Sequence, residues 1–242
     1  METKTTTTLG RKTMATMRRK DPHLGTWMAP DPMAEKYPGI SPYLYCSGDP
    51  VNVVDPQGDT LLFAPGVSER FKQQFAEAVE FMNAAGTSYN IAKIHASERV
   101  YYIKEGKKST FQYDRMTIVW NPNRIVYNSY SGLLRSPATV LAHEFRHAED
   151  YDMLVRKGKT QEEAKTILGA YNEQYDTEAD RRAITETEQY VARAHGEIGS
   201  NQVTRTNHRT DPSKEPVLPD YSNTTLREKI ELIMAFNRGI YL

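Results

Sequence analysis

The spacing of the hydrophobic residues changes near residue 59 and divides the chain in two. From residue 67 to 85, hydrophobic side chains recur three or four positions apart, at Phe71, Phe75, Ala78, Val79 and Met82. This period predicts a helix with one buried face, ended by Gly86. Residues 1–58 have no comparable period and hold seven of the 13 prolines, so we expect turns and short strands there.

Short runs of β-branched and aromatic residues follow, and they predict strands at residues 89–94, 99–104, 110–113, 116–120 and 124–127. Ser136 can cap a helix and Pro137 is tolerated at its first position, so a helix is predicted from there to about Arg156. Further helices are expected at residues 161–168, 176–194 and 224–238, with a polar loop at 199–223. The predicted fold class is therefore α+β.

The formal net charge is zero, since 31 Lys and Arg balance 31 Asp and Glu, but the charges are unevenly placed. Residues 1–20 carry six basic residues and one acidic residue, which predicts a flexible basic head. Residues 143–197 carry 13 acidic and eight basic residues. This excess of negative charge opposes the approach of phosphates, so no nucleic-acid partner is expected.

Cysteine content and hydropathy exclude other classes of protein. Cys46 is the only cysteine, so an internal disulfide is excluded. No hydrophobic run is long enough to cross a membrane. The polar N-terminus lacks the apolar segment of an ordinary secretory signal, so none is expected.

The segment from His143 to His147 reads His-Glu-Phe-Arg-His, an HExxH motif inside a predicted helix. Residues four apart lie on one face of a helix, so both imidazoles can point at one metal ion. Neutral imidazole is a good ligand for Zn²⁺, and zinc is therefore the expected cofactor. Glu144 follows the first histidine and is expected to take a proton from the attacking water as general base.

A third ligand must come from the acidic segment downstream, where helix geometry leaves two arrangements open. In one, Asp176 is the ligand and Asp180, one turn further on, is the carboxylate that holds a ligating histidine. In the other, Asp180 is the ligand and Glu188 holds the histidine. Glu178 is a further candidate. Each acid could equally belong to a solvated helix face paired with Arg181 and Arg182.

Further downstream, Arg205 and His208 stand three residues apart. Near a zinc site such a pair could stabilise the oxyanion of a tetrahedral intermediate, and the alternative is a plain polar loop. His23, His95 and His195 have no other candidate ligand at a fixed spacing, so they are expected to be ordinary surface or interior histidines.

The segments DPHLGTW (21–27), PDPMAEKYP (30–38), ISPYLYC (40–46) and NVVDPQGD (52–59) follow one another in the N-terminal part. Together they resemble the C-terminal end of an Rhs repeat-associated core. In Rhs proteins a large β-cocoon encloses a variable C-terminal toxin, and an Asp-Pro-x-Gly end of the core marks the junction. Asp55-Pro56-Gln57-Gly58 fits that junction. The resemblance implies an Rhs remnant over residues 21–58 and a toxin domain over residues 59–242.

The toxin region contains, in order, HExxH at 143–147, Ala-Asp-Arg-Arg-Ala-Ile at 179–184, Glu188, Gly196-Glu197 and Arg205-x-x-His208. This order resembles the effector-type zinc metallopeptidases of type III effectors and polymorphic toxins, which are similar in site layout to clostridial neurotoxin light chains. The resemblance implies a zincin-like fold, with a small sheet, an active-site helix and a third-ligand helix.

By this resemblance His143, His147 and Asp180 hold zinc, and Glu144, Arg205 and His208 are catalytic. Two departures stand out: Asp180 replaces the family's Glu, and Ala179 replaces the first acid of a pair.

The implied function is a zinc protease toxin, delivered into the cytoplasm of a target cell, that hydrolyses a target-cell protein. Its implied partners are that substrate, a cognate immunity protein and the Rhs core or secretion apparatus. The strand near Met116–Trp120 is expected to pair with the substrate backbone. Two alternatives remain: a non-enzymatic Rhs tip or binding module with a structural or inactive zinc site, and a toxin of another class such as a nuclease.

Overall fold

The computed structural model describes residues 61–95, 97–208, 221 and 223–240. The predicted basic head (1–20) and the Rhs-like segment (21–58) lie outside the described residues. Helices and strands are mixed along the rest of the chain, which confirms the α+β class. The described helices include none long and apolar enough to cross a bilayer.

The main sheet has four strands in the order β1 (Leu61–Phe63), β2 (Tyr101–Glu105), β4 (Thr117–Trp120) and β3 (Thr110–Gln112). β1, β2 and β4 run parallel, and β3 pairs antiparallel with β4. β4 is therefore bonded on both sides and has no free edge for a substrate, so the expectation for Met116–Trp120 is wrong. The edge strands of the sheet are β1 and β3, and β3 is the one beside β4.

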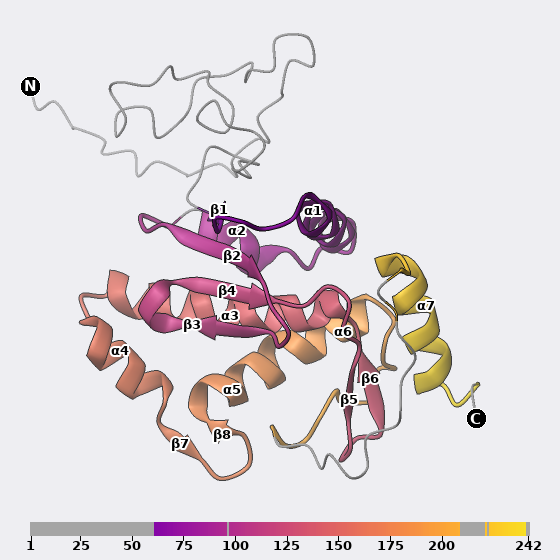
Figure 1. Ribbon diagram of the computed structural model, residues 1–242. Coiled ribbons are helices and arrows are strands. Elements are labelled where there is room, and N and C mark those ends of the chain that lie inside the picture. The colour runs from indigo at the N-terminus through magenta and orange to yellow at the C-terminus, as the bar shows by residue number, and fades with distance from the viewer. Residues whose placement is uncertain (1–60, 96, 209–220, 222, 241–242) are drawn as a thin grey trace, which may run out of the picture.

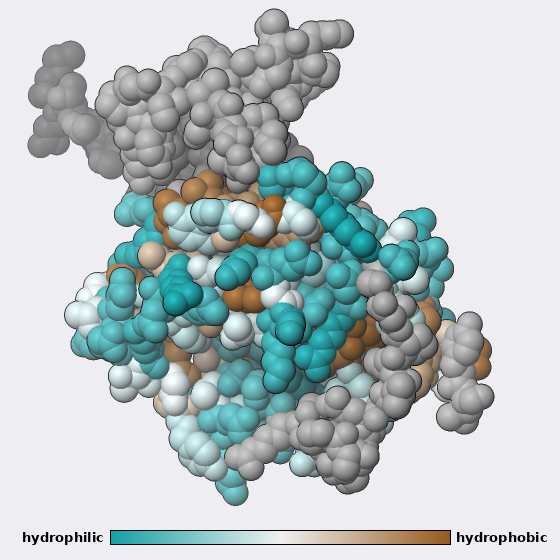
Figure 2. Space-filling view, viewed as in Figure 1, coloured by the Kyte–Doolittle hydropathy of each residue, from teal (hydrophilic) through white to brown (hydrophobic). Residues whose placement is uncertain are grey.

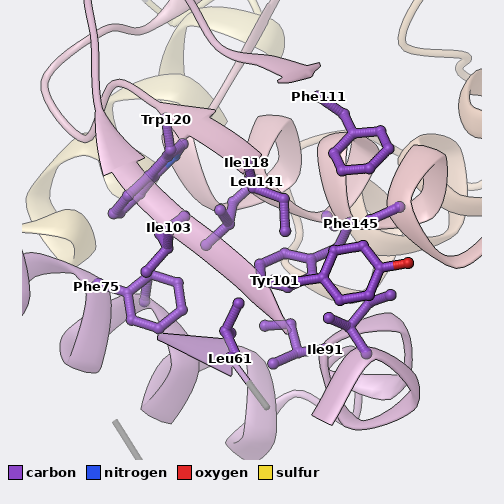
Figure 3. Close-up of a cluster of buried hydrophobic side chains, with 14 of the residues drawn as sticks. Leu61, Phe75, Ile91, Tyr101, Ile103, Phe111, Ile118, Trp120, Leu141 and Phe145 are labelled. Carbon is purple, nitrogen blue, oxygen red and sulfur yellow. The ribbon is translucent and has the colours of Figure 1, made fainter. Parts of the chain in front are cut away.

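Three helices cover the sheet: α1 (Glu69–Ala84), α2 (Tyr89–His95) and α3 (Pro137–Arg156). Figure 3 shows their hydrophobic side chains meeting those of the strands in one cluster. The cluster is rich in aromatic rings, and the ring of Trp120 packs against those of Phe71 and Phe75. The Trp120 indole N–H donates to the carbonyl of Pro137, 2.8 Å away, which ties β4 to the first turn of α3. The core thus fixes the start of α3 relative to the sheet.

The predicted strand at residues 89–94 is wrong, because this segment is helix α2. Its hydrophobic residues Ile91 and Ile94 are three apart and both are buried, in the spacing of a helix face. α2 packs against α3. The β-branched residues of this short segment favoured a strand, and tertiary packing overrides that preference. The strands predicted at 99–104, 110–113, 116–120 and 124–127 are confirmed, with shifted ends.

The predicted helices at residues 67–85, 137–156, 161–168 and 224–238 are confirmed as α1, α3, α4 (Gln161–Leu168) and α7 (Leu226–Asn237). A small hairpin of β5 (Val126–Asn128) and β6 (Leu133–Arg135) precedes α3. Residues 199–208, the described first part of the predicted loop, hold no helix or strand.

The single helix predicted at residues 176–194 is wrong in form. Its start pairs as strand β8 (Asp176–Thr177) with β7 (Tyr171–Asn172), and Asp176 has a left-handed φ of 66° that a helix does not allow. The helix then begins after its N-cap residue Thr177, whose hydroxyl accepts a hydrogen bond from the backbone N–H of Asp180. It runs as α5 (Glu178–Arg182), the π-helical turn η4 (Ala183–Glu188) and α6 (Gln189–Ala194).

Gly106 lies between β2 and β3 where no side chain fits. A Cβ added there would stand 2.2 Å from Cγ1 of Val119. We expect Gly106→Ala to lower the free energy of unfolding by about 1–3 kcal/mol, because the strands must move apart. Urea unfolding measures the loss. In the double variant with Val119→Ala the combined loss should be smaller than the sum of the two single losses; simple additivity would contradict this packing.

Candidate metal centre

Helix α3 carries the HExxH residues and is held at its N-terminus by buried polar contacts. The hydroxyl of the N-cap Ser136 accepts from the Thr139 N–H at 3.1 Å. Glu197, which is buried, accepts from the Ser136 N–H at 3.0 Å and from the Thr139 hydroxyl at 2.7 Å. A carboxylate at a helix N-terminus is favourable to the helix dipole. These contacts link α3 to the loop after α6 and set its position.

His143 and His147 point their Nε2 atoms at each other across one helical turn, 3.0 Å apart. Asp180 reaches the same point from α5, with Oδ1 3.5 Å from Nε2 of His147 and 4.0 Å from Nε2 of His143. Two ligands of a tetrahedral Zn²⁺ lie about 3.3 Å apart, given bond lengths of about 2.0 Å. The three atoms are thus spaced as metal ligands are. The group can hold a metal ion.

The protonation state of His143 suits this use. Nδ1 of His143 lies 3.0 Å from Oε2 of Glu188 and 3.3 Å from Nη2 of Arg205. The shorter contact, to a carboxylate, makes Nδ1 the protonated nitrogen and leaves a lone pair on Nε2. Burial lowers the pKa of His143 to about 3, which keeps the ring neutral. A neutral imidazole with a free Nε2 is what a metal requires.

Glu188 lies at the end of the π-helical turn, fully buried behind His143. Arg135 and Arg205 each donate to its Oε2 at 2.8 Å. Burial alone would raise the pKa of Glu188, but the charges of the two arginines outweigh it and hold the pKa well below the ordinary value. Glu188 is therefore an anion that fixes the His143 ring. Of the two arrangements open from the sequence, this is the one with Asp180 in the ligand position.

The other acids of the segment have different partners. Asp176 accepts from Nδ1 of His208 at 3.0 Å. Glu178 is half exposed and is held by Arg181 of the same helix. Neither is part of the ligand group with the two histidines.

Glu144 is buried beside the ligand group and lines the same cleft. Burial raises the pKa of Glu144 to about 7. A carboxyl group with a pKa near neutrality can both take and return a proton, as a general base requires.

A cleft of about 710 Å³ opens over this group. Its walls are the edge strand β3 and the residues after it on one side, and α4 and α5 on the other. Figure 2 shows that the face seen in Figure 1 is mostly hydrophilic. The free edge of β3 runs beside the ligand group in this cleft, in the place expected for an extended peptide.

Arg205 and His208 both reach the centre from the loop after α6. The guanidinium of Arg205 is buried and held by Glu188 through Nε at 3.2 Å and Nη2 at 2.8 Å. Nε2 of His208 lies 3.3 Å from Oδ1 of Asp180 and borders the cleft. The remaining described histidines are interior residues: His95 is buried, and His195 bonds to Thr87 and Glu197. His23 lies outside the described residues.

Two residues of the centre were missed by the sequence reasoning. Arg135 is a buried ion-pair partner of Glu188, and nothing in its local sequence distinguishes it from a surface arginine. Tyr113 lines the cleft, and burial together with Asp180 and Glu144 raises the pKa of its phenol. It directly follows strand β3, in a segment that carries no motif.

The chain matches no protein-family model, no curated protein and no solved structure. The class that fold and site define is thus a mixed α+β protein with a His-His-Asp group able to hold a metal ion.

The ligand position of Asp180 predicts a ranking of three variants. We expect Asp180→Ala to weaken zinc binding by more than about 100-fold, the upper end of the loss for a residue that only orients a ligand, because one of three ligands is lost. Asp176→Ala and Glu178→Ala should weaken it much less, since these acids bond to His208 and Arg181. Competition with a coloured chelator measures the affinities. A larger loss in either control variant would reassign the ligand.

Proposed function

We propose that residues 59–242 form a zincin-like metalloprotease, a toxin that hydrolyses peptide bonds in a protein of the cell it enters. The observation that carries the proposal is the position of Glu144. Its carboxylate is buried in one cleft with the His143, His147 and Asp180 group, and the edge strand β3 borders that cleft. A metal group, a base and a strand edge are the parts that hydrolysis of an extended peptide needs.

The choice of zinc rests on the ligand types. Two imidazole nitrogens and one carboxylate oxygen are a common set of protein ligands in catalytic zinc sites. A structural zinc site has four protein ligands, whereas a catalytic site keeps one position open. Three ligand groups gather among the described residues, and they border a cleft. This favours a catalytic site over the structural zinc site of a binding module.

When bound, zinc supplies a Lewis acid that polarises the scissile carbonyl and acidifies water. Glu144 takes the proton of the attacking water on its carboxylate and passes it to the leaving amine. Glu188 keeps the His143 ring aligned throughout, through its contact with Nδ1.

Arg205 and His208 stabilise negative charge on the carbonyl oxygen in different ways. Two nitrogens of Arg205 are held by Glu188, so it contributes a fixed positive charge beside His143. His208 is oriented by Asp176 through Nδ1 and presents Nε2 at the cleft; as an imidazolium, with a proton on each ring nitrogen, it can donate a hydrogen bond there.

The biological setting of the proposal comes from the Rhs resemblance of residues 21–58. It makes the chain a delivered effector that acts in the target cytoplasm, with an immunity protein in the producing cell. The excess of acidic residues over 143–197 supports a protein substrate over a nucleic acid.

Metal content and cleavage mapping test the proposal together. The purified full chain should contain one zinc per molecule, and His143→Ala should lose it. Zinc-loaded protein added to a lysate of the recipient cell should create new protein N-termini, and a chelator should prevent them. Absence of zinc from the wild-type protein, or no new N-termini with zinc bound, would refute the proposal.

A further inference from the structure

A second pocket of about 220 Å³ adjoins the cleft on the far side of His143 and Glu144. It shares Ser109 and His208 with the main cleft, so the two spaces meet at the metal group. Its lining is dominated by basic side chains: Lys108, Arg124, Arg135 and Arg205. The one carboxylate in its lining is Glu144.

These four cations differ in what neutralises them. Arg135 and Arg205 are buried and paired with Glu188. Lys108 and Arg124 are exposed, and within the described part of the chain neither forms an ion pair or a side-chain hydrogen bond. The pocket therefore presents two uncompensated positive charges next to the proposed catalytic centre.

The loops that carry the two cations are joined to each other. Lys108 lies between β2 and β3, and Arg124 lies between β4 and β5. Asn121 connects these loops, since its Nδ2 donates to the Lys107 carbonyl at 2.9 Å and its N–H donates to the Ser109 hydroxyl at 3.2 Å. Its Oδ1 also accepts from the Asn123 N–H at 3.0 Å.

The second loop is anchored to the body of the protein as well. Asn123 accepts from Gln74 of α1 at 2.9 Å. The two positive charges thus stand on a fixed pair of loops, which makes a binding site for an anion without further ordering of the backbone.

The opposite end of the cleft, at α4, differs in its charge. There Lys165 of α4 is paired with Asp114 and Glu162, so its charge is compensated. Arg115 also lines this end and has no ion pair within the described residues. A bound peptide therefore meets two unpaired cations at the end formed by Lys108 and Arg124 and one at the end formed by Arg115.

We propose that this pocket is a specificity site for a carboxylate of the substrate, held by Lys108 and Arg124 beside the scissile bond. The inference rests on the proposed protease function and names its substrate class: a protein cut next to an acidic residue. A carboxylate can also come from the C-terminus of a chain, and the experiment separates the two sources.

Cleavage of a peptide library tests the preference. Zinc-loaded wild-type protein should cut acetylated and amidated peptides that carry Glu at one fixed position about tenfold faster than matched peptides with Gln, given two exposed charge pairs. The variant Lys108→Glu/Arg124→Glu should lose this preference. Cutting of free-acid peptides alone would assign the pocket to the chain terminus and refute the side-chain assignment.

Lys107→Glu is the matched control. It introduces the same charge reversal as the Lys108→Glu part of the double variant, one residue away in the same loop, but Lys107 does not line the pocket. It should keep the preference for Glu over Gln. An equal loss in Lys107→Glu would mean that overall charge, and not the pocket, sets the preference, and would overturn the proposal.

Binding without cleavage separates this inference from the proposed function. Zinc-loaded Glu144→Gln protein, immobilised, should retain the Glu peptides about tenfold better than the Gln peptides. Adding the two charge reversals should abolish the difference. This result supports the carboxylate site even if the wild-type protein cuts nothing, a failure that would fall on the protease proposal alone. Equal retention of both peptide sets would overturn the carboxylate site.

Discussion

Replacement of Glu144 by Gln is expected to slow peptide hydrolysis strongly and leave zinc binding unchanged. The amide has almost the same size and cannot take a proton, so the loss should lie within about 10²–10⁴-fold, the usual contribution of a general base. Glu144 is not among the three candidate ligands, and zinc should stay bound. Rates on a cleaved peptide, together with zinc content by elemental analysis, measure both halves of the result.

Two outcomes would contradict this assignment. Unchanged hydrolysis with full zinc content would remove Glu144 from the reaction. Loss of zinc in Glu144→Gln would make it a ligand or a structural support. Glu149 of the same helix offers a control, because it binds Asn90 away from the cleft. Glu149→Gln should keep both activity and zinc.

Replacement of Glu188 by Ala is expected to destabilise the protein more than any change of a surface charge. Glu188 is fully buried and neutralises two buried arginines, Arg135 and Arg205. Removing one partner of a buried charge group leaves the others unpaired, which costs about 3–5 kcal/mol. The ring of His143 also loses its fixed orientation, so zinc affinity should fall by about 10–100-fold. Urea unfolding and chelator competition measure the two effects.

Glu186 supplies the comparison for this variant. It lies two residues earlier in the same π-helical turn, and its ion pair with Arg146 lies at the protein surface. Glu186→Ala should cost less than about 1 kcal/mol, as exposed pairs do. If Glu188→Ala unfolds at the same urea concentration as Glu186→Ala, the buried charge group does not support the fold.

How far the fold follows from the sequence depends on the length of each element. Helix α3 has a cap at Ser136, a proline at its first position and a long hydrophobic face, and local signals predict it fully. α2 has seven residues, and its hydrophobic residues fit a strand as well as a helix. The packing of α2 against α3 favours the helix over the strand, and a short stretch of sequence does not show that packing.

The candidate site divides in the same way. The positions of His143 and His147 follow from helix periodicity, because four residues separate them on one element. The choice of Asp180 over Asp176 depends on the backbone of Asp176, whose left-handed φ keeps it out of the helix, so that the helix starts only at Glu178. The role of Arg135 arises only in three dimensions, since Glu188 is 53 residues away.

The π-helical turn η4 also sets how many residues can separate Asp180 and Glu188 in the sequence while both still face His143. In a regular α-helix, residues eight apart, such as Asp180 and Glu188, differ by about 80° around the axis. A π-helical turn takes up an extra residue and brings the eighth position back toward the first. An interval of seven residues aligns two side chains without such a turn, since it is about two regular turns. The number of residues between the two acids therefore indicates the helix type. A chain shortened by one residue within 183–187 would keep Asp180 and Glu188 aligned only if the π-helical turn became a regular α-helical turn.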